Sequence, residues 1–145
     1  MKCKRNEHLS FKLQHRMKID HIAIWVQNLE VMKTFYETYF QAKTGEKYHN
    51  PTKNFTSYFL SFENGCRLKL MHKAEIPTNK NDLALQYIGI IHFAISVGSK
   101  NKVDNLTDSL RQAGYNVVSE PRTTGDGYYE SVVLDPESNR IEITV

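Results

Sequence analysis

Hydrophobic and polar residues alternate in two short stretches of this 145-residue chain that are nearly copies of one another. Ile19–Val26 reads IDHIAIWV and Ile90–Val97 reads IIHFAISV, so each stretch carries a histidine at its third position. In both, the residue after the histidine and every second residue beyond it are apolar, which is the period of a strand with one buried face. We therefore predict a β-strand at each stretch.

A helical pattern follows each predicted strand. Asn28 and Ser99 have side chains that cap helix N-termini well, and apolar residues recur after them at helical spacing. The apolar positions are Leu29, Met32, Tyr36 and Tyr39/Phe40 in the first helix, and Val103, Leu106, Leu110 and Ala113 in the second. Gly45 and Gly114 predict the helix ends, because glycine readily terminates a helix.

Further strands are predicted after each helix, because β-rich stretches there are separated by turn-forming residues. These strands are Ser57–Phe62 and Cys66–His72 in the first half, and Tyr128–Leu134 and Arg140–Val145 in the second. The two halves repeat at an offset of 71 residues for the first strands and 73 for the last. Such a period over two copies predicts a duplicated βαβββ module, covering about 17–73 and 88–145, with the polar linker Ala74–Gln86 between.

The phase of the strands predicts which side chains share a surface. The helix-facing residues of the last strands are Leu68, Leu70, Ile141, Ile143 and Val145. Lys69 and Glu142 then point to the opposite face, and the same argument places His21 and His92 there. We expect an α+β fold of two cupped mixed sheets with the helices on their outer face. Two imidazoles, a carboxylate and an ammonium on the concave side form a candidate site.

Composition narrows the possible functions. The chain is 40% hydrophobic and 24% charged, as in ordinary globular domains. Its net charge of +3 comes from residues 1–16, which we interpret as a basic N-terminal extension of a single domain, 17–145. The body has no basic excess, so nucleic acid is not expected as a partner. A membrane partner is not expected either, because apolar runs are short, and the two unpatterned cysteines favour a cytoplasmic location.

The paired modules, the histidine near the start of each and the closing NRIEI of Asn139–Ile143 resemble the vicinal oxygen chelate superfamily. That superfamily includes glyoxalase I, extradiol dioxygenases, fosfomycin-resistance thiol transferases and bleomycin-resistance proteins. The resemblance covers 17–145, and Pro121–Glu130 is similar to the C-terminal half of a small glyoxalase-like protein.

The resemblance implies a divalent metal ion held from four equivalent strand positions, which here are occupied by His21, Lys69, His92 and Glu142. In glyoxalase I relatives the position of Lys69 is a glutamate, and a protonated lysine cannot ligate a metal. His21, His92 and Glu142 remain, which resembles the ligand set of the dioxygenases and fosfomycin enzymes and suits Zn, Ni, Mn or Fe. Glu142 and Lys69 are the expected catalytic residues.

The resulting hypothesis is a glyoxalase-like, metal-dependent enzyme of the lyase or isomerase type that acts on a small oxygenated, metal-chelating substrate. A metal-free small-molecule-binding protein of the bleomycin-resistance kind is one alternative, in which a Lys69–Glu142 ion pair fills the metal position. A thiol transferase or dioxygenase using the three ligands is another. Trp25, Tyr128 and Glu130 are expected to line the substrate pocket. We also expect a homodimer, with the site inside one chain or shared between swapped modules.

Overall fold

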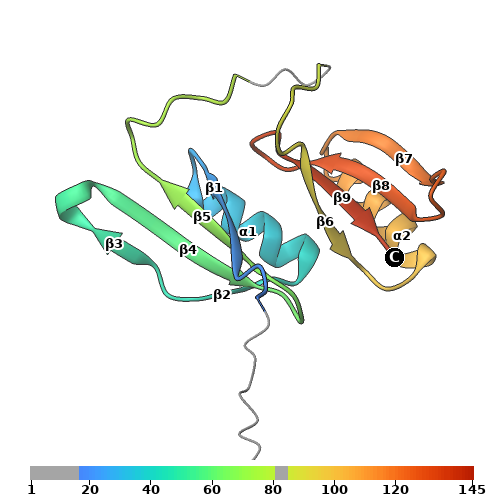
Figure 1. Ribbon diagram of the computed structural model, residues 1–145, viewed down its shortest axis with the longest axis horizontal. Helices are drawn as coiled ribbons and strands as arrows, with labels where there is room; N and C mark the ends of the chain where they lie inside the picture. The colour runs from blue at the N-terminus through green and yellow to red at the C-terminus, as the bar shows by residue number, and fades with distance from the viewer. Residues whose placement is uncertain (1–16, 81–84) are drawn as a thin grey trace, which may run out of the picture.

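Two sheets lie side by side in the computed structural model, and each carries one helix (Figure 1). The structure describes residues 17–80 and 85–145. The predicted basic extension, 1–16, lies outside the described residues, as do linker positions 81–84.

The first module contains a five-stranded mixed sheet. Its strands are β1 (His21–Trp25), β2 (Lys43–Thr44), β3 (Tyr48–Asn50), β4 (Phe55–Ser61) and β5 (Arg67–His72), with the short 3₁₀ helix Pro51–Lys53 before β4. The spatial order is β1-β5-β4-β2, and β3 also pairs with β4. β1 runs parallel to β5, whereas the other pairs are antiparallel.

The second module repeats this topology in a four-stranded sheet. Its strands are β6 (His92–Ser96), β7 (Val117–Thr123), β8 (Tyr129–Leu134) and β9 (Arg140–Thr144). Their order is β6-β9-β8-β7, and β6 is again parallel to the last strand of its module. The predicted α+β fold with a duplicated module is thus confirmed. The sequence analysis had not located β2, β3 and β7.

The two helices begin where the sequence predicts. The Asn28 side chain accepts a hydrogen bond from the Val31 amide at the start of α1 (Leu29–Phe40), and Ser99 caps α2 (Lys100–Gln112) in the same way. Gly114, just after α2, has a positive φ of 88°, a conformation that glycine adopts without strain. No helix in the described parts of the chain is both long and apolar enough to cross a membrane.

The predicted end of the first helix at Gly45 is wrong. α1 ends at Phe40, and Gln41 adopts the left-handed conformation that reverses the chain. The next residues leave the helix because Lys43–Thr44 pair with β4 as strand β2. Glycine is the residue that usually adopts this conformation after a helix, and here Gln41 does so. The sequence pattern therefore did not predict the end of α1.

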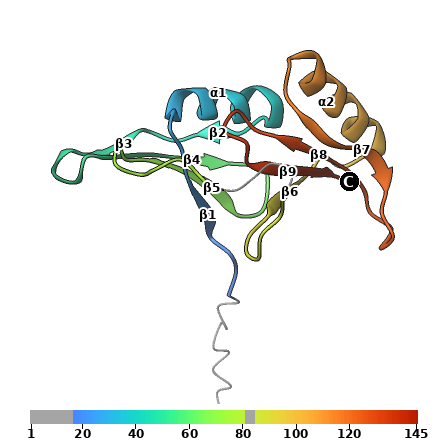
Figure 2. The same ribbon diagram turned by 90° about the horizontal axis from the view of Figure 1, so that it is seen from above.

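The core lies between the helices and the sheets, since both helices cover the same side of the molecule (Figure 2). The fully buried side chains include Met32, Tyr36, Leu60, Leu70, Leu110, Ile141 and Ile143. The predicted inward phase of β5 and β9 is confirmed by these positions. Val145 is the exception, because it follows the end of β9 and is 45% exposed.

The turn between β8 and β9 joins the two modules. The Tyr36 hydroxyl of α1 donates to Asp135 Oδ2 at 2.9 Å, and both residues are buried. The Glu137 carboxylate accepts hydrogen bonds from the Gln27 and Asn28 amides at 2.8–2.9 Å. Burial raises the pKa of the Asp135 carboxyl, although hydrogen bonds from Asn139 and Tyr36 act in the opposite direction. These contacts set the position of the second module against α1.

Candidate functional site

Strand register places the four predicted site residues at equivalent points of the two modules. In the first, His21 lies beside Arg67 and Ala23 beside Lys69. In the second, His92 lies beside Arg140 and Ala94 beside Glu142. Because the residues flanking Lys69 and Glu142 in their strands face the helices, these two side chains lie on the sheet faces that the helices leave uncovered.

The second module brings two of the predicted metal ligands together. His92 Nε2 lies 3.3 Å from Glu142 Oε2, and the Glu142 side chain is only 17% exposed. A neutral histidine nitrogen and a carboxylate oxygen are both acceptors when the nitrogen carries no proton. The ring proton placed on Nε2, or a cation bound by both atoms, removes this repulsion. The imidazole nitrogen and the carboxylate oxygen are both ligand atoms that suit a divalent cation. We call His92 and Glu142 a half-site, because they supply two of the three predicted ligands.

Glu130, for which a place in the substrate pocket is predicted, adjoins this pair. Burial and the nearby Glu142 carboxylate raise the pKa of Glu130, whereas Arg122 lowers it. Arg122 Nη2 lies 3.7 Å from the Glu130 carboxylate. The raised pKa means that Glu130 takes up a proton more readily than an isolated glutamate does.

The first module holds His21 in a defined orientation. His21 Nδ1 lies 2.9 Å from Asp20 Oδ2, and a carboxylate can only accept, so Nδ1 carries the proton. In the neutral ring the lone pair is then on Nε2, the arrangement that a metal-ligating histidine requires. Phe59 contacts the ring edge-on at 5.2 Å between centroids. Hydrogen bonds from His21 and then Arg67 hold the pKa of Asp20 below its usual value.

Lys69 lies on the same face as His21 but contacts aromatic rings. Its Nζ is 5.0 Å from the centre of the Phe59 ring and 5.7 Å from that of Phe55. Within residues 17–80 and 85–145 it forms no ion pair, so the suggested pairing of Lys69 with Glu142 does not occur inside one chain.

The two half-sites are not joined within the chain. Among the described residues, no group of three or more His, Cys, Asp or Glu side chains is arranged to hold a metal ion. His92 and Glu142 form one half-site, and His21 with Lys69 lies on the sheet of the other module.

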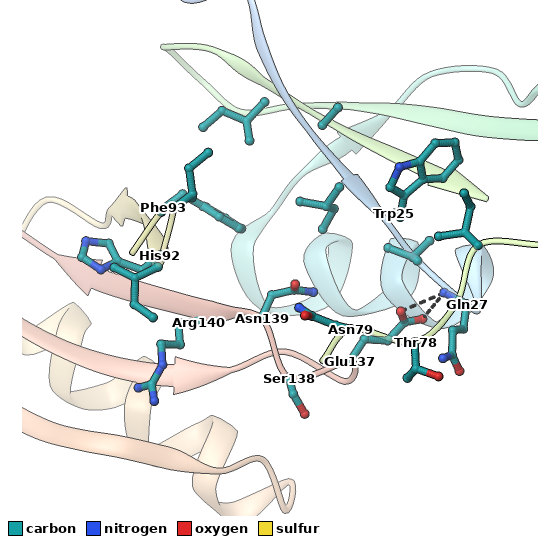
Figure 3. A pocket seen from close by; sticks show the side chains of 18 of the residues that line it. Trp25, Gln27, Thr78, Asn79, His92, Phe93, Glu137, Ser138, Asn139 and Arg140 are labelled. Atoms are coloured by element: carbon teal, nitrogen blue, oxygen red, sulfur yellow. Dashed lines mark hydrogen bonds between the residues drawn. The ribbon is translucent and has the colours of Figure 1, made fainter. Parts of the chain in front are cut away.

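A cavity of about 940 Å³ lies between the modules. It is lined by β1, by 72–79 and 85–93, and by the turn 136–140. Trp25 and His92 line it from different modules and lie well apart in the close view of Figure 3. The Glu137 carboxylate, bonded to the Gln27 amide, forms part of its wall (Figure 3).

Trp25 and Tyr128, the other two residues predicted to line the substrate pocket, are both exposed. Trp25 is 43% exposed and its ring meets Phe55 edge-on at 6.0 Å. Tyr128 is 59% exposed and lies just before β8, where its carbonyl accepts a hydrogen bond from the Thr124 amide.

Sequence reasoning missed Asp20, although a signal for it was present. The first strand reads Asp20-His21, whereas the second reads Ile91-His92, so the first copy departs from the repeat at this position. The roles of Phe55 and Phe59 were also missed, because their contact with Lys69 depends on the pairing of β4 with β5.

Solved structures place the fold in the glyoxalase-like class. Glyoxalase I of Leishmania major, described as trypanothione-dependent, has a TM-score of 0.69 at 23% identity, covering 89% of this chain and 86% of that chain. A glyoxylase/bleomycin resistance protein/dioxygenase domain from Frankia sp. has a TM-score of 0.74 at 16% identity, covering 90% and 98%. Zea mays glyoxalase I has a TM-score of 0.71 at 21% identity over 88% of this chain, which spans only 44% of the maize chain.

The sequence itself matches the Glyoxalase/Bleomycin resistance protein/Dioxygenase superfamily over residues 18–143, and the protein belongs to this superfamily. A curated relative, the uncharacterized protein YqjT of Bacillus subtilis, is 24% identical over 126 residues. That alignment covers 85% of this chain and 94% of YqjT.

Proposed function

We propose that the protein is a glyoxalase-like, metal-dependent enzyme that acts on a small oxygenated molecule. His92 and Glu142 from one module and His21 from the other are the proposed metal ligands. The main support is the 3.3 Å approach of His92 Nε2 to Glu142 Oε2, two donor atoms on adjacent strands of an uncovered sheet face. Two histidines and one carboxylate suit Zn, Mn, Fe or Ni and leave coordination positions for a substrate.

The hydrogen bond between Asp20 and His21 supports His21 as the third ligand. The Asp20 carboxylate accepts the Nδ1 proton, which leaves the Nε2 lone pair available. A carboxylate bonded to the second ring nitrogen also orients the ring and makes the ligating nitrogen more basic. Asp20 is therefore a positioning residue in this proposal.

The proposed enzyme is a homodimer. Among the described residues of one chain, His21 is not grouped with His92 and Glu142, so the proposal completes the ligand set by turning the first module of one protomer toward the second module of its partner. β1 and β6 are edge strands of their sheets, and unpaired strand edges favour association with another chain.

The residues around the site have proposed roles in proton transfer. A bound divalent cation would act as a Lewis acid toward the oxygens of a chelating substrate. Glu130, whose pKa is raised by burial and by Glu142, is suited to hold a proton beside the substrate. Lys69 is suited to donate a hydrogen bond to a developing oxyanion.

Metal binding tests the proposal directly. We expect purified protein stripped with chelator and titrated with Ni, Zn or Mn to bind one ion per chain by calorimetry. His92→Ala and Glu142→Ala should each weaken binding at least about tenfold, as loss of a ligand removes one of three bonds to the ion. His49→Ala is the matched control, because His49 is exposed on β3 and should leave affinity unchanged. Equal affinity in all three variants would refute the ligand assignment.

Mixing two inactive variants tests the shared site. His21→Ala and Glu142→Ala chains are refolded together, so that about half of the dimers contain one chain of each kind. In a shared site, each mixed dimer has one complete ligand set, and about a quarter of the wild-type metal capacity returns. A site inside one chain gives no recovery. A species of 17 kDa in sedimentation at micromolar concentration would also exclude the dimer.

A metal-free binding protein is the second candidate, and Lys69 is the observation that favours it. Lys69 occupies the fourth ligand position without a carboxylate partner in the described residues, so it is available to pair with the partner's Glu142 across a dimer. Under this hypothesis no divalent ion binds even at millimolar concentration, and Lys69→Met weakens the dimer.

A further inference from the structure

The uncovered face of the first module combines aromatic rings with cationic groups. We call it the cationic aromatic face, and it consists of His21, Trp25, Phe55, Phe59, Arg67 and Lys69. Trp25 meets Phe55 edge-on, and the Arg67 guanidinium lies 4.3 Å from the centre of the Phe59 ring. The face thus combines aromatic rings that meet edge-on with positive charge beside them.

The charge of this face is concentrated at Lys69. Arg67 Nη2 lies 2.5 Å from Asp20 Oδ2, and the same carboxylate oxygen accepts from His21. Asp20 therefore neutralises Arg67. Lys69 has no such partner in the described part of the chain, and it is half-buried against Phe59 and Phe55.

Aromatic contacts hold the Lys69 ammonium in place but do not accept its hydrogen bonds. A ring face attracts the cation through its quadrupole but accepts no strong hydrogen bond. The three N–H donors of the ammonium remain available for an anion. An anion bound there would be charge-paired beside an apolar surface, where water competes less strongly than in open solvent.

We propose that this face is a binding subsite for a small organic acid with a flat apolar body. Its carboxylate pairs with Lys69, and its apolar part lies against Phe55, Phe59 and Trp25. The inference rests on the proposed function, because it names the substrate class of the same site.

Benzoate is the probe, with benzyl alcohol, acetate and benzylamine as comparison compounds of altered charge or lacking a ring. Binding is measured by calorimetry, and Trp25, the single tryptophan of the chain, reports contact with the face by fluorescence. We expect benzoate to bind at least about tenfold more tightly than benzyl alcohol, acetate or benzylamine, and to change Trp25 emission.

The Lys69 variants separate charge from fold. Lys69→Met should remove the preference for benzoate over benzyl alcohol, whereas Lys69→Arg should retain most of it. Lys100→Met is the matched control, because Lys100 also lies over a ring, 4.9 Å from the centre of Tyr129, but on the helix side of the other module. It should bind benzoate like the wild type. If wild type shows no preference, or if Lys69→Met and Lys100→Met behave alike, the inference is overturned.

Repeating the titrations with and without bound metal distinguishes this inference from the proposed function. Benzoate selectivity that persists in chelator, with no metal binding in the ligand test, supports the subsite and refutes the metal enzyme. Metal binding that depends on His92 and Glu142, without benzoate selectivity, supports the enzyme and refutes the subsite.

Discussion

Replacing Tyr36 with phenylalanine should destabilise the contact between the two modules. Tyr36 is fully buried, and its hydroxyl donates at 2.9 Å to Asp135, which is only 4% exposed. Burial and the Asp135 charge raise the pKa of the Tyr36 phenol well above its usual value, so the hydroxyl is protonated and donates at neutral pH. The substitution removes this donor and little volume.

The size of the effect follows from the surroundings of Asp135. Its carboxylate keeps hydrogen bonds from the Glu137 amide and from the backbone and side chain of Asn139. One bond to a buried charged group is therefore lost, which lowers the free energy of unfolding by about 1.5–3 kcal/mol at pH 7. Full removal of the carboxylate would cost more, because it leaves several donors unpaired.

The pH dependence has a definite sign. Because the folded pKa of Asp135 is raised above its ordinary value of 3.8, the folded state holds this proton more tightly than the unfolded state. The contribution of Asp135 is therefore most favourable below pH 3.8 and falls as pH rises through the folded pKa. Tyr36→Phe removes a bond that stabilises the charged form, so it raises that pKa further. Its cost should be larger at pH 7 than below pH 3.8.

Urea unfolding followed by circular dichroism at several pH values measures both quantities. Tyr39→Phe is the control, because Tyr39 lies on the same helix and packs against Phe35 and Tyr115 through its ring. We expect it to change the free energy of unfolding by less than about 0.5 kcal/mol. If the two variants are equally stable, or if the Tyr36→Phe cost is the same across the pH range, the hydrogen bond to Asp135 does not stabilise the fold as argued.

Three further changes test other parts of the structure. Glu137→Ala should lower the free energy of unfolding by about 1–2 kcal/mol in urea titrations, because the Gln27 and Asn28 amides lose their acceptor. Ser99→Ala should cost about 1 kcal/mol by the same measurement through loss of the α2 cap, and an unchanged midpoint would contradict the capping role. Lys69→Glu should tighten metal binding measured by calorimetry, since a fourth ligand, a second carboxylate, becomes available, and unchanged or weaker affinity would place position 69 away from the ion.

The alternation of side chains along the strands predicted which face of its sheet each candidate site residue occupies. Alternation is a local property, and pairing in the predicted phase put Lys69 and Glu142 on the faces opposite Leu68 and Ile141. What could not be read was which faces meet. Whether the uncovered face that carries His21 meets the one that carries Glu142 depends on contacts between modules, and nothing in either repeat encodes them locally.

The sequence by itself determined the duplication, the two capped helix starts and the buried phase of the last strands, because each depends on residues close together in the chain. Only the tertiary structure decided the end of α1. The helix ends without a glycine, because Lys43–Thr44 pair with β4. It also decided how the modules dock, through the contact of Asp135 with Tyr36, which are 99 residues apart. Such long-range hydrogen bonds form only when burial brings the partners together, and no periodic pattern predicts them.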